Sequence, residues 1–319
     1  MKILINDVAV ELLGDPHLGR PFSKGVPLHR RGEREKMQRA DFQASLEAGA
    51  DADIHVCLGD LFDRVNVSNN VVIEAALDYE AAELDRVVCI PGNHDISRDT
   101  TVKSSFELFE MMVKDIVQIP MTKPLILRIR DTKLVFIPWS PIMTASEMVG
   151  AHAADIALAD VIFGHWDIVA IHATDNLIPA ALLKSLGVKR AITGHDHNQR
   201  ELEIDGLDVF VTGSMQPYSH AEDPNELIYV TRTMDQLTTE DFTNKCLRVR
   251  LAPGEIFDMT IDCLALTTIT AEQELTEALA DVGFEAFDFT ALWTEAMVNI
   301  NPDISEELLT KFREIGGEE

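Results

Sequence analysis

The sequence is poor in cysteine and has no long apolar run. Its four cysteines stand at irregular intervals without a CxxC pair, which argues against a disulfide framework and against a thiolate zinc site. No stretch approaches the roughly 18 uncharged apolar residues of a membrane-spanning helix. The N-terminus also lacks a charged leader followed by a long apolar core. We therefore expect a soluble protein with no membrane partner, in a reducing cytoplasm.

Basic residues are also scarce. Lys and Arg number 27 against 54 Asp and Glu, a formal net charge of −27, which is unfavourable for nucleic-acid binding over the surface as a whole. Residues 20–39 are the exception, with seven basic and two acidic side chains. Residues 251–319 hold 16 acidic and two basic side chains. A polyanionic substrate would therefore have to be bound locally, away from the C-terminal region.

The apolar pattern predicts an α/β protein. Val- and Ile-rich runs end in Gly, Asp, Asn or His loops and are followed by helical periodicity. The predicted strands are residues 8–13, 54–58, 86–90, 125–130, 134–138, 161–163, 190–193, 202–204, 209–212, 227–231 and 246–251. The predicted helices are residues 33–49, 69–84, 104–116, 145–158, 180–186, 271–282 and 304–315. Turn signals at Asp131-Thr132 and Asp205-Gly206 predict hairpins, so the second half of the sheet is partly antiparallel.

The length of 319 residues fits one catalytic domain with a smaller appendage. The apolar periodicity stops near residues 234–244. We therefore expect a catalytic domain over residues 1–235 and a small C-terminal region over residues 236–319.

Five polar motifs come directly after predicted strands. They are Gly14-Asp15-Pro16-His17, Gly59-Asp60-Leu61-Phe62-Asp63, Gly92-Asn93-His94-Asp95, Gly164-His165 and Gly194-His195-Asp196-His197. Loops at the carboxyl ends of strands converge in an open α/β sheet, so these side chains are expected to meet. One such motif alone indicates little more than a turn, whereas five in series indicate a site.

Oxygen and imidazole donors without thiolate suit Mn²⁺, Fe²⁺ or Zn²⁺, and the number of donors exceeds what one ion takes. Two ions are therefore predicted. A metal pair about 3.5–4 Å apart clamps a phosphate, converts a bridging water to hydroxide near neutral pH and stabilises the leaving oxygen. The expected reaction is hydrolysis of a phosphoester.

The ordered set DxH, GDxxD, GNHD, GH and GHxH resembles the calcineurin-like metallophosphoesterase superfamily over roughly residues 8–232. The resemblance implies an α/β fold in which a β-sandwich is flanked by helices. It implies that Asp15, His17 and His197 bind one metal, that Asn93, His165 and His195 bind the other, and that Asp60 bridges both. His94 is implied as the catalytic residue beside the phosphate, with Asp95 orienting it.

Three further segments are similar to the SbcD/Mre branch of DNA repair and recombination nucleases, especially its phage-encoded members. They are Ile137-Pro138-Trp139, the sequence FGHWD at residues 163–167, and the sequence TGSMQPYS at residues 212–219 followed by Glu222. Trp139 as a core aromatic and Gly213-Ser214 as a plain turn are the structural alternatives.

The branch implies Mn²⁺ as cofactor, DNA as substrate, a homodimer, and an SbcC-like coiled-coil ATPase as partner. The location would be the cytoplasm of a bacterial or archaeal host cell if the protein is phage-encoded. The apolar spacing over residues 304–315 suits docking of a helix on that ATPase, or equally packing on its own domain. Arg20 and Arg64 follow metal-binding loops and are our candidates for binding the DNA backbone.

The sequence differs from the SbcD/Mre branch at two places, and each difference limits which of the branch's properties we expect here. Some relatives carry a second catalytic histidine after GDxxD, where this chain has Asp63-Arg64-Val65, so His94 is expected to act alone. The segment after Met234 is short, which leaves room for a reduced capping region and a partner-binding tail. Two other functions stay open: a phosphoesterase for a small molecule or a protein, and a non-catalytic scaffold of a recombination complex.

Overall fold

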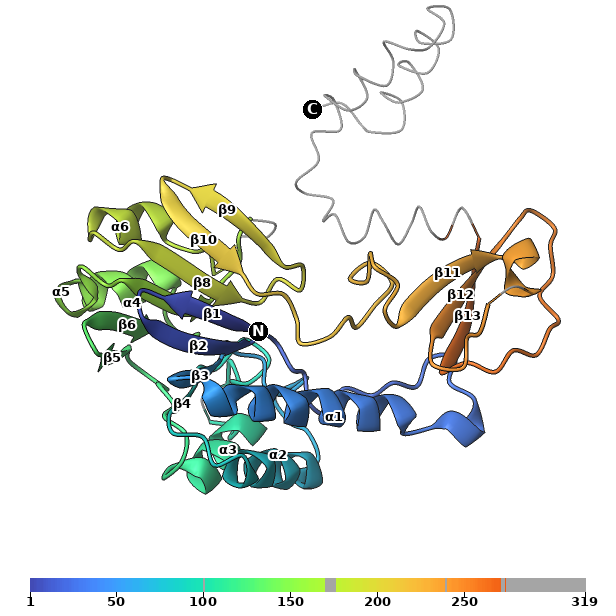
Figure 1. The fold of residues 1–319 in the computed structure, drawn as a ribbon, viewed down its shortest axis with the longest axis horizontal. Helices are drawn as coiled ribbons and strands as arrows, with labels where there is room; N and C mark the ends of the chain where they lie inside the picture. The colour runs from blue at the N-terminus through green and yellow to red at the C-terminus, as the bar shows by residue number, and fades with distance from the viewer. Residues whose placement is uncertain (100, 170–175, 239, 271–272, 274–319) are drawn as a thin grey trace, which may run out of the picture. The chain divides into compact units, whose positions relative to one another are not determined.

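The computed structural model describes residues 1–99, 101–169, 176–238, 240–270 and 273 (Figure 1). Compactness separates a main unit, Met1–Ala170 with Thr174–Ile269, from the remaining residues. The tail helices predicted over residues 271–282 and 304–315 lie outside the described residues. No helix among those described combines the length and the apolar character needed to cross a membrane.

The first sheet has the strand order β1-β2-β3-β4. Its strands are Lys2–Ile5, Val8–Leu13, Ile54–Cys57 and Val87–Cys89. β1 pairs antiparallel with β2, and β2, β3 and β4 are parallel. The three parallel strands therefore deliver the loops that follow them to one edge.

The second sheet has the order β5-β6-β7-β8-β10-β9. Its strands, in chain order, are Leu125–Ile129, Thr132–Phe136, Val161–His165, Arg190–Gly194, Arg200–Ile204 and Leu207–Val211. β6, β7, β8 and β10 are parallel, and the two outer strands are antiparallel to their neighbours. Both predicted hairpins are present. Asp205 and Gly206, with φ of 49° and 76°, make the tight turn between β9 and β10.

The two sheets pack face to face with helices on the outside of each (Figure 1). The shared core takes Val10, Val56 and Val88 from the first sheet and Phe136 and Phe163 from the second, all buried. Helices α1 (Glu33–Ala48), α2 (Asn69–Ala81) and α3 (Ser105–Val113) cover the first sheet. Helices α4 (Ala145–Ala151), α5 (Ala153–Ile156) and α6 (Ala180–Ser185) cover the second. The predicted β-sandwich flanked by helices is confirmed.

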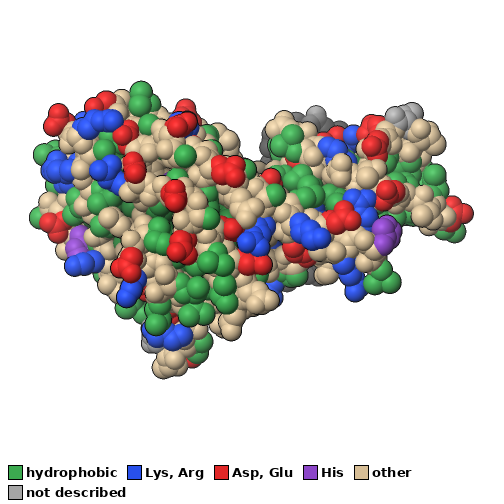
Figure 2. Space-filling model, turned by 60° about the horizontal axis from the view of Figure 1, so that its bottom comes forward, with side chains coloured by type: hydrophobic (Ala, Val, Ile, Leu, Met, Phe, Trp, Pro, Cys, Tyr) green, Lys and Arg blue, Asp and Glu red, His purple; other side chains and the backbone are tan. Residues whose placement is uncertain are grey.

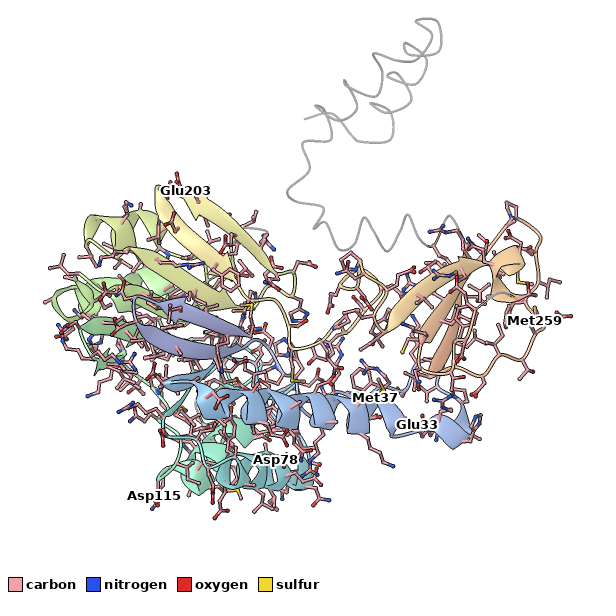
Figure 3. All side chains as sticks on the ribbon, viewed as in Figure 1. Glu33, Met37, Asp78, Asp115, Glu203 and Met259 are labelled. Atoms are coloured by element: carbon pink, nitrogen blue, oxygen red, sulfur yellow. The ribbon has the colours of Figure 1, made fainter. Side chains whose placement is uncertain are left out.

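Helix α1 is buried along one narrow stripe. Arg34, Gln38, Phe42 and Leu46 repeat every four residues and are the buried members. Two of the four are polar, so this helix supplies functional groups as well as core. On its other side, Asp78 of α2 accepts hydrogen bonds from α1 side chains, including Arg39 Nε at 3.2 Å (Figure 3).

A third sheet, β11-β12-β13, follows the sandwich. Its strands are Tyr229–Thr233, Cys246–Leu251 and Ala265–Thr270. We expected the C-terminal region to begin at residue 236. β11, before this position, pairs in parallel with β12, after it. Met37 of α1 packs against the apolar side chains of this sheet (Figure 3).

The sequence pattern missed two edge strands and joined two helices into one. β1 and β13 were not predicted, because β1 has only four residues and three of the six residues of β13 are threonines. The helix expected over residues 145–158 is interrupted at His152, whose φ of −115° and ψ of 21° are not helical. The interruption divides it into α4 and α5.

His55 in β3 is a buried histidine without a hydrogen-bond partner on either ring nitrogen. Burial lowers its pKa to about 3, whereas an unfolded chain has a value near 6.5. Between these values the unfolded state binds a proton that the folded state rejects, so stability falls as pH drops below about 6.5. We expect His55→Leu to remove about 2 kcal/mol of the stability difference between pH 7 and pH 5. Urea unfolding at both pH values, in EDTA, measures this, and an unchanged difference would contradict it.

Candidate metal centre

The loops that carry the five motifs come from both sheets and lie close together. The first motif follows β2, the second follows β3 and the third follows β4, while His165 ends β7 and the last motif follows β8. Ligand atoms from the five motifs meet in groups whose members lie within 4.8 Å of one another or in hydrogen-bond contact, although the motifs span residues 15 to 197. Gln38 of α1 supports the first loop by donating to the carbonyl oxygens of Pro16 and His17 at 2.9 and 2.8 Å.

The first cluster consists of Asp15, His17 and His197, which have ligand atoms within 4.8 Å of one another. His17 Nε2 lies 3.1 Å from His197 Nε2. His197 Nε2 is 3.7 Å from Asp15 Oδ2. Asp15 Oδ1 is buried and has no hydrogen-bond partner. This is the trio implied for the first metal.

The second cluster consists of Asp60, His165 and His195, again with ligand atoms within 4.8 Å of one another. His165 Nε2 lies 3.3 Å from Asp60 Oδ2, 3.2 Å from His195 Nδ1 and 2.9 Å from the Asn93 amide oxygen. Asp60 Oδ2 is also 3.9 Å from His17 Nε2 in the first cluster. Asp60 therefore touches both clusters, as a bridging carboxylate must.

The hydrogen bonds on the outer side of each ring decide which nitrogens face inward as acceptors. His165 Nδ1 donates to the Leu58 carbonyl oxygen at 2.9 Å, and His195 Nε2 donates to Asp167 Oδ1 at 2.8 Å. In neutral rings the inner nitrogens of both then carry lone pairs. The lone pairs of His165 Nε2 and His195 Nδ1 then face the Asp60 carboxylate with no proton between them. A bound cation stabilises such an arrangement. The residues present therefore fit a pair of divalent metal ions.

The backbone of the loops is strained where it presents the ligands. His17, Asp60 and His195 have φ of 47°, 47° and 81°, in the left-handed region that costs a non-glycine residue about 1–2 kcal/mol. Such strain persists only where surrounding structure imposes it, and it concentrates at functional sites. Gly92 has no room for a side chain, because a Cβ there would lie 2.2 Å from Asp60 Oδ1.

Burial separates the proton affinities of the ligands. It raises the pKa of Asp15 well above its usual value and lowers that of His17 to about 3. Burial opposes ionisation of Asp60 as well, but the imidazoles of His165 and His17 outweigh it and hold the pKa of Asp60 below its usual value. A neutral His17 and an ionised Asp60 are the forms that bind metal.

His94 stands on the open side of the centre. Its side chain is 43% exposed, and its Nε2 lies 4.0 Å from Asp60 Oδ2. Its Nδ1 donates to the Asp63 carbonyl oxygen at 2.6 Å. The second aspartate of GDxxD therefore orients the ring through its backbone.

Asp95 does not contact the His94 ring, which the family resemblance implied it would orient. Its carboxylate accepts the backbone N–H groups of Leu61, Phe62 and Gly92 at 3.1, 3.0 and 2.9 Å, and it is fully buried. Asp95 thus ties the third loop to the second and shapes the turn around Asp60. The expected contact with the His94 ring is replaced by the Asp63 carbonyl, because the carboxylate is saturated by amide donors.

The two candidates for backbone phosphate binding lie beside Asp63. Arg20 Nη1 is 3.4 Å from Asp63 Oδ1, and Arg64 Nη2 is 3.1 Å from Asp63 Oδ2. The Arg20 guanidinium also lies over the Tyr218 ring, 4.9 Å from its centroid. Since Asp63 holds His94, both arginines lie next to the open side of the site.

The segment at residues 213–219 is part of the site's frame. Met215 N donates to the Asp15 carbonyl oxygen at 3.4 Å, and the Tyr218 hydroxyl donates to the same oxygen at 3.2 Å. Trp139 is buried, and its backbone N–H donates to the Pro91 carbonyl oxygen at 3.2 Å, just before the third motif. These residues support the ligand loops from behind.

Two carboxylates behind the ligands were not predicted as functional. Asp167 holds His195, and Glu222 lies 3.1 Å from His197 Nδ1. The bond to His197 outweighs burial and lowers the pKa of Glu222 to about 2. Asp167 stands two residues after His165, which was a usable signal, but no spacing relates Glu222 to His197. Both imidazoles of the GHxH motif are therefore oriented by a carboxylate.

Neutralising either carboxylate is expected to weaken one metal selectively. Asp167→Asn should reduce affinity at the second cluster, and Glu222→Gln at the first, each by about 10–100-fold, because the ring loses the partner that fixes its tautomer. Titration of the metal-free protein with Mn²⁺, followed by calorimetry, resolves the two binding steps. Wild-type affinity at both steps in both variants would contradict this role.

The chain matches the model of one known protein family. The profile of the calcineurin-like phosphoesterase family matches residues 10–199. No curated protein matches the chain. Among solved structures, a phosphopantetheinyl hydrolase from Mycobacterium tuberculosis is similar at 14% identity, covering 66% of this chain and 93% of its own, with a TM-score of 0.42. An archaeal phosphodiesterase is similar at 16% identity, covering 66% and 87%, with a TM-score of 0.34.

The matched residues contain all the predicted metal ligands, and the clusters of His and Asp can hold divalent ions. This chain belongs to the calcineurin-like phosphoesterase family, whose members hydrolyse phosphoesters.

Proposed function

We propose that this protein is a Mn²⁺-dependent DNA nuclease of the SbcD/Mre type, acting in recombination or double-strand-break processing. The observation that carries the proposal is the pair of ligand clusters sharing Asp60, with His94 on their open side. Such a site suits in-line displacement at a phosphodiester, where an attacking and a leaving oxygen are stabilised together.

When bound, the two ions would supply Lewis acidity to the phosphate and an activated water. Asp15, His17 and His197 would hold one ion, and Asn93, His165 and His195 the other, with Asp60 between them. Water attacks phosphorus, the ester P–O bond breaks, and the sugar oxygen takes a proton from His94. The proton that the attacking water releases passes to solvent, and His94 takes a proton back from solvent before the next turnover. The products are a phosphate monoester and a hydroxyl group. Because His94 Nδ1 is engaged with Asp63, Nε2 is the nitrogen that donates this proton.

DNA as substrate is supported by local charge. Arg20 and Arg64 are beside His94, and the only dense basic segment of the sequence begins at Arg20. Elsewhere acidic and basic side chains intermix, as Figure 2 shows for one face. A strand would therefore be bound along the path that leads to the metal centre, not across the surface as a whole.

The remaining parts of the proposal concern assembly. We assign the region after residue 235 to reduced capping and partner binding, with an SbcC-like coiled-coil ATPase docking on the tail and a homodimer presenting two sites to one duplex. The amphipathic spacing at residues 304–315 supports the docking. The proposed location is the bacterial or archaeal cytoplasm.

The substrate is tested by assaying the purified protein with Mn²⁺ on labelled duplex DNA, single-stranded DNA and an aryl phosphodiester, with and without the ATPase. We expect cleavage of DNA. Turnover of the aryl ester with no DNA cleavage under either condition would reject the nuclease.

The second candidate is a phosphodiesterase for a small substrate. The net charge of −27 favours it, because a strongly acidic protein repels a polyanion more than a single nucleotide or small ester. The same assay separates the two.

A further inference from the structure

A pocket of about 290 Å³ opens beside the metal centre, away from the ligands. Its walls come from residues 20–26, the start of α1, residues 218–220 and the third sheet. Four cationic side chains line it: Arg20, Lys24, Arg34 and Arg248. None of the described residues that line it is acidic, in a chain with twice as many acidic as basic residues.

Arg34 is the cation that most needs an anion. Its side chain is 2% exposed, and its hydrogen bonds go to the Gln216 amide oxygen at 3.0 Å and the Pro217 carbonyl oxygen at 3.5 Å. Its Nε is buried without a partner. No carboxylate within the described residues forms an ion pair with it, whereas Arg30 and Arg39 nearby pair with two carboxylates each. The Arg34 charge favours ionisation of Asp41, also on α1, but no described carboxylate contacts the guanidinium directly. A buried guanidinium that no carboxylate contacts is costly, and an anionic ligand would reduce that cost.

The pocket also has flat aromatic walls. Phe22 and Tyr218 are nearly parallel, at 22° with centroids 6.4 Å apart. The Arg34 guanidinium lies over Phe22, 4.5 Å from its centroid, and 5.7 Å from the Tyr229 centroid. Half-buried Phe22 offers a ring on which a planar group can stack. Proteins bind single-stranded nucleic acid with cationic side chains that contact the phosphates and aromatic rings on which the bases stack. This pocket has both.

Tyr218 joins the pocket to the metal centre. Its ring lines the pocket and is 5.3 Å from the His17 ring, and its hydroxyl donates to the carbonyl oxygens of Asp15 and Pro16. Arg20 lines the pocket and also pairs with Asp63. A strand with one phosphate at the metals would therefore have its next nucleotide at this pocket.

We infer that this pocket is a nucleotide subsite that binds the phosphate and stacks the base of the nucleotide next to the scissile phosphate. The inference rests on the proposed function and deepens it, because it requires a substrate with a nucleotide on that side. The volume of about 290 Å³ lies just below the roughly 300–1,000 Å³ range of small-ligand pockets. It suits one unpaired nucleotide and not a duplex.

Binding of a fluorescent single-stranded hexanucleotide, measured by anisotropy in EDTA over a series of salt concentrations, tests the subsite without cleavage. Phe22→Ala should weaken binding about ten-fold, because it removes a stacking ring. Lys24→Gln should lower the slope of log K against log salt by about 0.7, because one phosphate contact is lost. Lys24 is exposed, so its replacement leaves the fold intact.

The matched control is Lys114→Gln, which makes the same charge change at the C-cap of α3, outside the pocket. It should keep the wild-type affinity and slope. If both pocket variants bind like the wild type, or if the wild type does not bind the hexanucleotide, the subsite is rejected.

Cleavage by the wild type with Mn²⁺ reports on the proposed function separately. Binding that depends on Phe22 and Lys24, without DNA cleavage either with or without the ATPase, would reject the nuclease and keep the pocket as a nucleotide-binding site. DNA cleavage by the wild type, with no effect of either variant on binding, would keep the nuclease and reject the subsite.

Discussion

Asp60→Ala is expected to abolish both metal binding at the paired site and phosphoester hydrolysis, lowering kcat by about 10³-fold or more. Asp60 Oδ2 lies within 4 Å of imidazole nitrogens from both clusters, 3.9 Å from His17 Nε2 and 3.3 Å from His165 Nε2. Its loss leaves these lone pairs without the negative charge that holds two cations together. Metal content after dialysis and turnover of an aryl phosphodiester measure the two losses.

Asp60→Asn separates the charge from the backbone. Asparagine tolerates the left-handed φ of 47° at this position and keeps the shape of the side chain, so the protein should fold as the wild type while losing at least one metal. Circular dichroism checks the fold. Activity close to that of the wild type in either variant would exclude Asp60 as a bridging ligand and, with it, the two-metal site.

His94→Gln should lose about 10²–10⁴-fold in kcat while keeping both metals. His94 lies close enough to His17 and Asp60 to form a third group with them, but the two clusters assigned to the metals are complete without it, and its Nδ1 is held by the Asp63 carbonyl oxygen. Glutamine retains hydrogen-bonding capacity but cannot donate a proton to an alkoxide. Metal titration and steady-state kinetics on DNA provide the measurement.

Leaving-group dependence shows whether His94 acts as an acid. An aryl phosphodiester with a nitrophenol leaving group needs little protonation, so the loss in His94→Gln should be much smaller there than on DNA. An equal loss on both substrates would show that His94 binds the phosphate and does not protonate the leaving oxygen. Reduced metal content in this variant would assign it to the ligands instead.

The layers of the fold were predictable because their signals are local. β2 and β12 have the predicted bounds, and α1 begins at the predicted Glu33, since apolar alternation and helical spacing report which face is buried. β1 and β13 were not predicted, although β1 pairs with its immediate neighbour β2, because a four-residue strand and a threonine-rich strand give only a weak apolar signal. The break at His152 depends on packing that no local pattern records.

The amino-acid sequence by itself determined the kinds of donor atoms and the loops that carry them, because a Gly-Asp or Gly-His motif after each apolar strand is written in consecutive residues. Only the tertiary structure decided which atoms meet. In the folded protein, Asp95 accepts from amides around Asp60, and the Asp63 carbonyl oxygen accepts from His94. Asp167 and Glu222 contact the two imidazoles of the GHxH motif. The tertiary structure also left Arg34 buried without an acidic partner among the described residues. The physical reason is that hydrogen bonds and ion pairs depend on distances of a few ångströms between loops that are far apart along the chain, and packing of the two sheets sets those distances.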